Sequence, residues 1–183
     1  MGLPAMRRYT FIAINETKST RRRAMGIADT VDFALTLTDV DFQILRHHHS
    51  ATSAETARKA HIAEGELAKA VALKDDLGPL LAVMPANRVL DLECLQALLH
   101  RPGLVLMTED ELGTVFFDCE QGAVPPLGPD YRVPTVVDRS LMKKEDIYFE
   151  AGDHEDLIHV DRTGFRKLLR GAEFLDISRR GAG

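Results

Sequence analysis

The stretch "LAKAVALKDDLGPLLAVMP", Leu67 to Pro85, predicts a strand, a turn and a second strand. Its two apolar runs, "LAKAVALK" and "PLLAVMP", have the length of strands and are bounded by turn residues. Asp75-Asp76-Leu77-Gly78 lies between the runs, and polar residues followed by glycine are typical of a tight turn. We therefore expect the two strands to be neighbours in a sheet.

Helix and strand signals alternate irregularly around this hairpin. The pairs Thr52–Glu55 and Thr108–Glu111 have capping-box spacing, in which each side chain satisfies a backbone amide of the first turn. The helices expected are a short one in "DTVDFALTLTD", then residues 53–62, residues 91–99 with Asp91 as the cap, a short one ending near Phe117, and residues 162–169. Further strands are expected at residues 42–46 and in "LVLMT", "VPTVVD", "DIYFEAG" and "LIHVD". Because strands outnumber helices without a regular repeat, the pattern favours an α+β or mixed α/β fold around a curved sheet.

Size and composition fit one globular domain. The chain has 183 residues, of which 45% are hydrophobic and 28% charged. No apolar run approaches the roughly 20 residues that cross a membrane, and no signal peptide is recognised. Cys94 and Cys119 have no metal-binding or redox spacing. We expect a cytoplasmic protein without a membrane partner.

Charge is distributed unevenly along the chain. Residues 1–24 carry six Lys and Arg and one Glu, a net charge of +5, which leaves −10 for residues 25–183 because the whole chain is −5. A domain this acidic will not coat itself with nucleic-acid backbone, so we expect no DNA partner, although one local basic site could hold one end of a nucleic acid. Residues 1–24 are interpreted as a poorly ordered extension, with an RNA-gripping arm as the alternative.

Lys69 is the first candidate for chemistry. Side chains of a strand alternate between its faces, so Lys69 shares a face with Leu67, Val71 and Leu73. A charged amine among apolar groups is costly unless it is paired. One reading is a lysine at the mouth of a pocket that meets an anion; the other is a side chain that snorkels outward.

The second candidate is the loop "EQGAVPPLGPDY", Glu120 to Tyr131. Gly122 and Gly128 bracket the pair Pro125-Pro126 with almost no polar side chain between them. Glycine lets a ligand approach the main chain, and proline stiffens the loop while supplying no N–H. Such a loop can present its few backbone N–H groups to a carbonyl oxygen, as in an oxyanion hole. A plain structural turn is the alternative.

The remaining polar residues give weaker signals. His47, His48 and His49 alternate in direction if they lie in a strand, and no cluster of Cys or carboxylates completes a metal site. No metal ion and no cofactor is therefore expected. His154 lies in "AGDHEDL", a predicted connection between two strands. No nucleophile elbow, P-loop or Rossmann fingerprint is present.

Residues 25–178 resemble the YbaK/ProX-type aminoacyl-tRNA deacylases, freestanding relatives of the editing domain of prolyl-tRNA synthetases. Residues 1–24 and 179–183 lie outside the resemblance, as an extension and a tail. The stretches that carry it are "HHHSATSAETA", "GELAKAVAL", "LAVMPANRVLDLECLQALL", the Gly-x-x-x-Pro-x-Gly loop "GAVPPLG" and "YFEAGDHEDLIHV". The resemblance implies a compact fold with a mixed, partly barrel-like sheet flanked by helices. It also implies hydrolysis of the ester that joins a wrong amino acid to tRNA.

The resemblance also implies roles for particular residues. Lys69 matches the family's essential lysine, which lies near the terminal adenosine and its phosphate. Gly122, Pro126 and Gly128 match the loop that holds the aminoacyl group, with Pro125 beside them. The remaining implied substrate-binding residues are His47, Thr52 and, more loosely, His154. The ending "AGDHEDLIHV" departs from the best-known branches, so their amino-acid specificity does not transfer.

The partner implied by the resemblance is the acceptor end of an aminoacyl-tRNA, and an aminoacyl-tRNA synthetase is a further one. A small amino acid on a proline-type tRNA is expected, because a rigid proline-lined pocket excludes bulk. Two other readings stay open: a non-catalytic module that binds aminoacyl-tRNA or a synthetase, and an unrelated small-molecule hydrolase on a similar fold. The sequence gives no indication of the oligomeric state.

Overall fold

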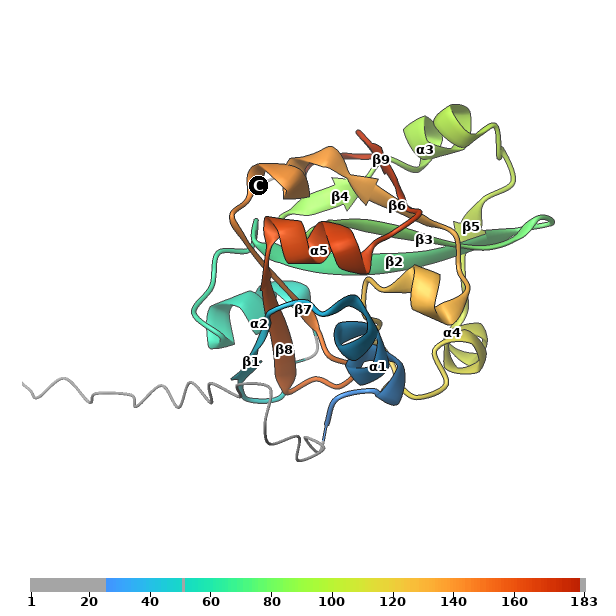
Figure 1. The fold of residues 1–183 in the computed structure, drawn as a ribbon. Coiled ribbons are helices and arrows are strands. Elements are labelled where there is room, and N and C mark those ends of the chain that lie inside the picture. Colours follow the sequence, from blue (N-terminus) through green and yellow to red (C-terminus); the bar gives the residue numbers. More distant parts are fainter. Residues whose placement is uncertain (1–25, 51, 182–183) are drawn as a thin grey trace, which may run out of the picture.

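The computed structural model describes residues 26–50 and 52–181, so the predicted extension at residues 1–24 lies outside the described residues. Strands far apart in the sequence form one mixed sheet in the order β1-β8-β7-β2-β3-β6-β9, with β5 also paired to β2 (Figure 1). The bounds are β1 Gln43–Arg46, β2 Leu67–Asp75, β3 Gly78–Pro85, β5 Val105–Leu106, β6 Thr135–Asp138, β7 Asp146–Glu150, β8 Asp156–Asp161 and β9 Glu173–Leu175. A separate two-stranded sheet pairs β4 (Arg88–Leu90) with β10 (Ser178–Arg180).

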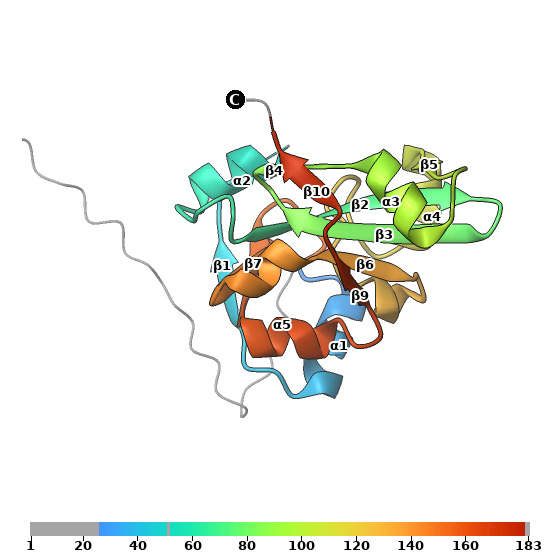
Figure 2. The same ribbon diagram turned by 90° about the horizontal axis from the view of Figure 1, so that it is seen from above.

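Helices cover both faces of the long β2–β3 hairpin (Figure 2). They are α1 Asp29–Thr38, α2 Ser53–Lys59, α3 Leu92–Leu99, α4 Glu109–Val115 and α5 Arg162–Leu168, with the 3-10 helices η1 Gly128–Tyr131 and η2 Arg139–Lys143. The apolar residues of α1 and α5 pack into one core with Leu81 and Val83 of β3. Leu95 of α3 packs into a second core with Leu80 and Ala82, which point to the opposite face of β3. The predicted mixed α+β fold, a mixed sheet flanked by helices, is confirmed.

The β2–β3 hairpin forms as the sequence predicts. The two strands pair antiparallel from Ala68 opposite Pro85 to Asp75 opposite Gly78. Gly78 has φ +106°, a conformation that side chains rarely adopt, and Asp75 Oδ1 accepts a hydrogen bond of 2.8 Å from the Leu77 amide. Arg101, in the loop after α3, binds the same carboxylate, with 2.8 Å between its Nε and Asp75 Oδ2.

The structure differs from the sequence predictions at several element ends. Helix α2 ends at Lys59 rather than near Ile62, because His61 turns to the left-handed region at φ 56°. The strands β4, β9 and β10, each three residues long, carried no sequence signal that predicted them. Residues 179 and 180, assigned from the sequence to a tail, belong to β10 and pair with β4.

The carboxylate of Asp138 connects three segments at the end of β6. Asp138 is 1% exposed, and its oxygens accept hydrogen bonds from the backbone and hydroxyl of Ser140, from the Ile177 amide (3.1 Å) and from the Ser178 hydroxyl (2.5 Å). Burial by itself would raise the pKa of Asp138, but these hydrogen bonds outweigh it and hold the pKa below its usual value. The ionised carboxylate therefore stabilises the attachment of β10.

Asp138→Asn should lower the free energy of unfolding by about 3 kcal/mol, because one oxygen that accepts hydrogen bonds from buried groups is replaced by a donor. Urea unfolding at pH 7 measures the loss, with the exposed turn residue Asp76→Asn as the matched control, expected within about 0.5 kcal/mol of wild type. The folded-state pKa of Asp138 is depressed, so its contribution is present above the unfolded-state pKa and is lost as pH falls. The difference between wild type and Asp138→Asn should shrink below about pH 4. Equal stability of the two proteins at pH 7 would contradict this role.

Candidate active site

A pocket opens where β2 loses its neighbour on one edge. The parallel pairing of β2 with β7 covers only Leu67 opposite Tyr148 and Ala68 opposite Phe149. On the same edge, β5 pairs with β2 only at Leu73 and Lys74. Strand pairing is therefore interrupted between residues 69 and 72, and a pocket of about 140 Å³ lies there.

Five segments of the chain line this pocket. The lining residues are Ser50, Thr52, Ser53, Thr56, Leu67, Ala68, Lys69, Ala70, Gly122, Val124, Glu150 and His154. Four of the residues predicted from the sequence, Lys69, Thr52, Gly122 and His154, are among them. The other four, His47, Pro125, Pro126 and Gly128, are buried and do not line the pocket.

Lys69 is half-buried, and its ammonium group uses only part of its hydrogen-bonding capacity within the described residues. Its Nζ donates one hydrogen bond of 3.1 Å, to the carbonyl oxygen of Ala86, and within the described residues it makes no other. Burial lowers the pKa of Lys69, and the negative charge of Glu64 opposes that shift. The side chain thus offers a partly desolvated positive charge to whatever occupies the pocket. Such a charge attracts an anion or a carbonyl oxygen more strongly than one in bulk water would.

The glycine–proline loop reaches the pocket through Gly122 and Val124. Gly122 has φ +87°, and a Cβ built there would lie 3.5 Å from the His154 ring. Two hydrogen bonds tie the loop to the β7–β8 turn: Glu120 N to Gly152 O (2.7 Å) and His154 Nε2 to Gln121 O (2.8 Å). Because a carbonyl only accepts, His154 Nε2 carries a proton.

The amide N–H groups of Gly122 and Val124 donate to no other described residue. The next two positions are prolines, which have no N–H. The donors that the loop can offer near the pocket are therefore few and lie in a short, tethered stretch. So few N–H donors suit a ligand group that accepts hydrogen bonds through a single oxygen atom.

Gly128 has a different environment from Gly122. It begins the helix η1, and a Cβ built on it would lie 2.1 Å from Thr135 Oγ1 and 2.9 Å from the Val133 carbonyl oxygen. Packing against the start of β6 therefore requires glycine there.

His47 is also enclosed: its Nδ1 donates to the His48 carbonyl oxygen at 2.9 Å, and its buried Nε2 has no partner among the described residues.

Glu150, at the end of β7, was not predicted as a site residue. Its Oε1 lies 3.2 Å from the Thr56 hydroxyl, while its Oε2 is buried and has no hydrogen-bond partner in the described part of the chain. Burial raises the pKa of Glu150 to about 8; the hydrogen bond with Thr56 lowers it, and the nearby charge of Asp153 raises it further. A glutamate that follows "IYF" and precedes "AG" looks like a solvated strand end in sequence. Glu150 reaches the pocket only because the pairing of β2 with β7 stops after Ala68 and Phe149.

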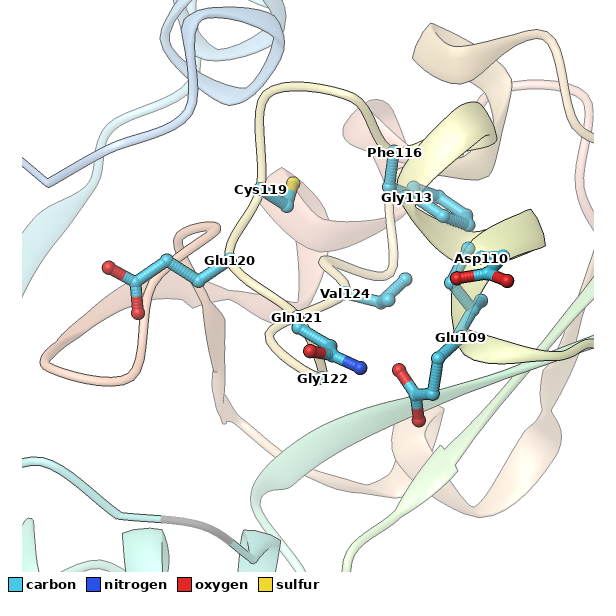
Figure 3. A pocket seen from close by; sticks show the side chains of 10 residues that line it. Glu109, Asp110, Gly113, Phe116, Cys119, Glu120, Gln121, Gly122 and Val124 are labelled. Atoms are coloured by element: carbon cyan, nitrogen blue, oxygen red, sulfur yellow. The ribbon is translucent and has the colours of Figure 1, made fainter.

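A second, larger pocket of about 340 Å³ shares Gly122 and Val124 with the first (Figure 3). Its other lining residues come from α4, from the segment that follows α4 and from the start of the loop: Glu109, Asp110, Leu112, Gly113, Phe116, Cys119, Glu120 and Gln121. Three of these are acidic and none is basic, so this pocket is a poor place for phosphate.

In residues 26–50 and 52–181, no group of three or more His, Cys, Asp or Glu is arranged to hold a metal ion. No helix within the same residues has both the length and the apolar character needed to span a membrane.

The buried carboxyl of Glu150 should make stability depend on pH. Its folded-state pKa, about 8, lies above its unfolded value near 4.5, so between these pH values the unfolded chain releases a proton that the folded chain retains. Rising pH therefore costs wild-type stability that Glu150→Gln does not lose. We expect the melting temperature of Glu150→Gln to rise relative to wild type from pH 5 to pH 8.

The exposed neighbour Glu155→Gln is the matched control for this measurement and should keep the pH dependence of wild type. Asp153, whose pKa is also raised by burial, is present in all three proteins, so only the part of its titration that is coupled to Glu150 enters the differences. Parallel curves for wild type and Glu150→Gln would show that the carboxyl ionises freely in the folded protein.

The family model of the aminoacyl-tRNA editing domain matches residues 47–168, more than half of the chain. No curated protein matches the sequence. Among solved structures, a candidate signal transduction protein from Marinobacter aquaeolei VT8 is similar at 28% identity and a TM-score of 0.67, over 81% of this chain and 30% of that one. This chain therefore spans less than a third of that protein.

Two smaller structures are covered almost completely. A candidate trans-editing enzyme for prolyl-tRNA synthetase has 22% identity and a TM-score of 0.69, over 82% of this chain and 95% of that one. The hypothetical protein APE2540 has 22% identity and a TM-score of 0.72, over 82% of this chain and 100% of that one. At these identities the likeness establishes the fold alone. The family match, however, includes every residue that lines the smaller pocket, and this chain belongs to the aminoacyl-tRNA editing domain family.

Proposed function

We propose that the protein is a trans-editing hydrolase that removes a small, wrongly attached amino acid from tRNA. Family membership supports editing in general. The observation that carries the more specific proposal is that Lys69 lines one small pocket together with Gly122 and Val124, whose amides make no hydrogen bond to a described residue. A volume of about 140 Å³ suits a small aminoacyl group.

The ester bond between an amino acid and tRNA is already activated, so the protein needs no strong nucleophile. In the proposed reaction a water molecule attacks the ester carbonyl carbon, and the bond to the ribose oxygen breaks. That oxygen takes a proton and leaves as the tRNA hydroxyl, while the amino acid leaves as its carboxylic acid. The protein contributes by positioning the ester and by stabilising negative charge on the carbonyl oxygen.

Each part of the pocket takes one role in this reaction. The amides of Gly122 and Val124 donate to the carbonyl oxygen, for which one donor is worth on the order of 3 kcal/mol of barrier. The ammonium of Lys69 holds the 3′ end of the tRNA through the adenosine and its phosphate. His154 keeps the loop in place through Gln121, and Thr52 begins the helix that forms the opposite wall. A ribose hydroxyl of the substrate helps to orient the water.

The tRNA contact is confined to the acceptor end in this proposal. Residues 25–183 carry a net charge of −10, which opposes extended contact with the phosphate backbone. A proline-type tRNA and a cytoplasmic location follow from the family resemblance, as does a synthetase as a further partner. The direct test is release of amino acid from a panel of mischarged tRNAs. Absence of release from every small aminoacyl ester would reject the proposal.

Lys69→Ala should lower the rate of deacylation at least about a hundredfold, or about 2.7 kcal/mol of transition-state stabilisation. The protein should still fold, because alanine removes a partly buried charge. Lys69→Arg should recover little, since a planar guanidinium does not replace a compact ammonium. The exposed lysine variant Lys143→Ala is the control and should keep wild-type turnover. Near-normal deacylation by Lys69→Ala would remove the basis of the proposed mechanism.

Gly122→Val should abolish deacylation, because a side chain at φ +87° strains the loop and adds bulk at the pocket wall. Gly171→Val is a matched control: its φ is +81°, a Cβ there meets nothing within 4 Å, and it does not line the pocket. Both variants should lose stability by on the order of 1 kcal/mol or more from backbone strain. Thermal melting and single-turnover deacylation separate the effects, and equal turnover in the two variants would make the loop an ordinary turn.

A further inference from the structure

We propose that Glu150, with Thr56 and Ser50, forms a polar subsite that hydrogen-bonds to a hydroxyl group on the side chain of the amino acid removed. Seryl and threonyl esters would then be preferred over alanyl esters. This inference rests on the proposed function, and it names the class of substrate within the small amino acids.

Strand register brings Glu150 and Lys69 to the same pocket. Ala68 lies opposite Phe149 in the last pair of the parallel β2–β7 ladder, so Lys69 and Glu150 are the next residue on each strand. Residues at matching positions of neighbouring strands point to the same face. Both residues line the pocket, so a ligand held at Lys69 shares this pocket with the Glu150 carboxyl.

The hydroxyl groups around Glu150 leave one of its two oxygens without a hydrogen-bond partner in the part of the chain that the structure describes. The single hydroxyl hydrogen of Thr56 has three acceptors within reach: Thr52 O at 3.0 Å, Glu150 Oε1 at 3.2 Å and Ser50 Oγ at 2.8 Å. The Ser50 hydroxyl reaches Thr56 but has no hydrogen bond with Glu150. Glu150 Oε2 keeps no partner among the described residues. A buried polar atom left in this state is destabilising unless a ligand or water meets it.

The protonation of Glu150 favours a neutral partner over a cation. Burial keeps its pKa at about 8, and the described charge that acts on it is another carboxylate, Asp153. Near neutral pH the group is therefore mostly a carboxylic acid, which can donate one hydrogen bond and accept another. A hydroxyl group has the same capacity and matches it. The methyl group of alanine would leave the carboxyl unpaired, and sites built to bond a hydroxyl reject analogues that lack it.

The experiment compares seryl, threonyl and alanyl groups attached through a stable amide to 3′-amino-3′-deoxyadenosine. Dissociation constants for the full chain are measured by calorimetry, alongside kcat/KM for the corresponding aminoacyl-tRNAs. We expect wild type to prefer the seryl and threonyl forms over alanyl by at least about tenfold in both measurements. Glu150→Gln should keep most of this preference, and Glu150→Met, similar in size but apolar, should lose it while binding the alanyl form as well as wild type does.

Two further variants make the result specific. Thr56→Val removes the hydroxyl and should reduce the preference without changing the backbone of α2, which keeps the comparison open if Glu150→Met does not fold. The exposed variant Glu155→Gln should behave as wild type. Equal binding of seryl and alanyl forms by wild type would overturn the inference. So would equal weakening of both by Glu150→Met, which would assign the carboxyl to the α-ammonium common to all substrates.

The two proposals fail in different ways. Selective binding of the seryl amide without hydrolysis of any ester would support the subsite and reject the deacylase. Hydrolysis of alanyl and seryl esters at equal rates would support the deacylase and reject the subsite.

Discussion

The end of parallel pairing between β2 and β7, after Ala68 and Phe149, is the constraint on which the site depends. Continued pairing would place backbone of β7 where the pocket now lies, and Lys69 would face a neighbouring strand. Because β3 stays paired with β2 from Ala68 to Asp75, the interrupted edge is supported from its other side even though it lacks a partner. The pocket is thus built on a strand held firmly from one side, which fixes side chains more accurately than a loop does.

The opposite wall obtains its rigidity by other means. The glycine–proline loop has no strand of its own, and its position is set by the hydrogen bonds of Glu120 and Gln121 to the β7–β8 turn. The prolines then fix their own φ angles and restrict the residue that precedes them. A site that uses backbone amides must keep them in place before the substrate arrives, since reorganisation during the reaction would cancel their benefit.

Local signals in the sequence predicted the elements well. The hairpin at Leu67–Pro85, the Asp91 cap and the Thr108–Glu111 capping box all depend on residues a few positions apart, and each is present in the structure. The strands β4, β9 and β10 were missed because three residues give no periodicity and their pairing depends on partners far along the chain. Glu150 was missed for the same reason: its burial depends on where two distant strands stop pairing, which no local pattern records. The roles of Lys69 and the loop came from family resemblance, and they remain predictions.

The two glycines of the loop show that one sequence motif can contain glycines required for two unrelated reasons. Gly122 is open on the side of the pocket, whereas Gly128 is enclosed by Thr135 and the Val133 carbonyl. In a related chain that had lost its activity, the need for open space at Gly122 would relax and only the strain of its positive φ would still favour glycine, while the requirement at Gly128 would persist as long as β6 packs in the same way. The motif as a whole therefore marks the architecture, and the state of its first glycine is the better indicator of whether a relative still works on a substrate.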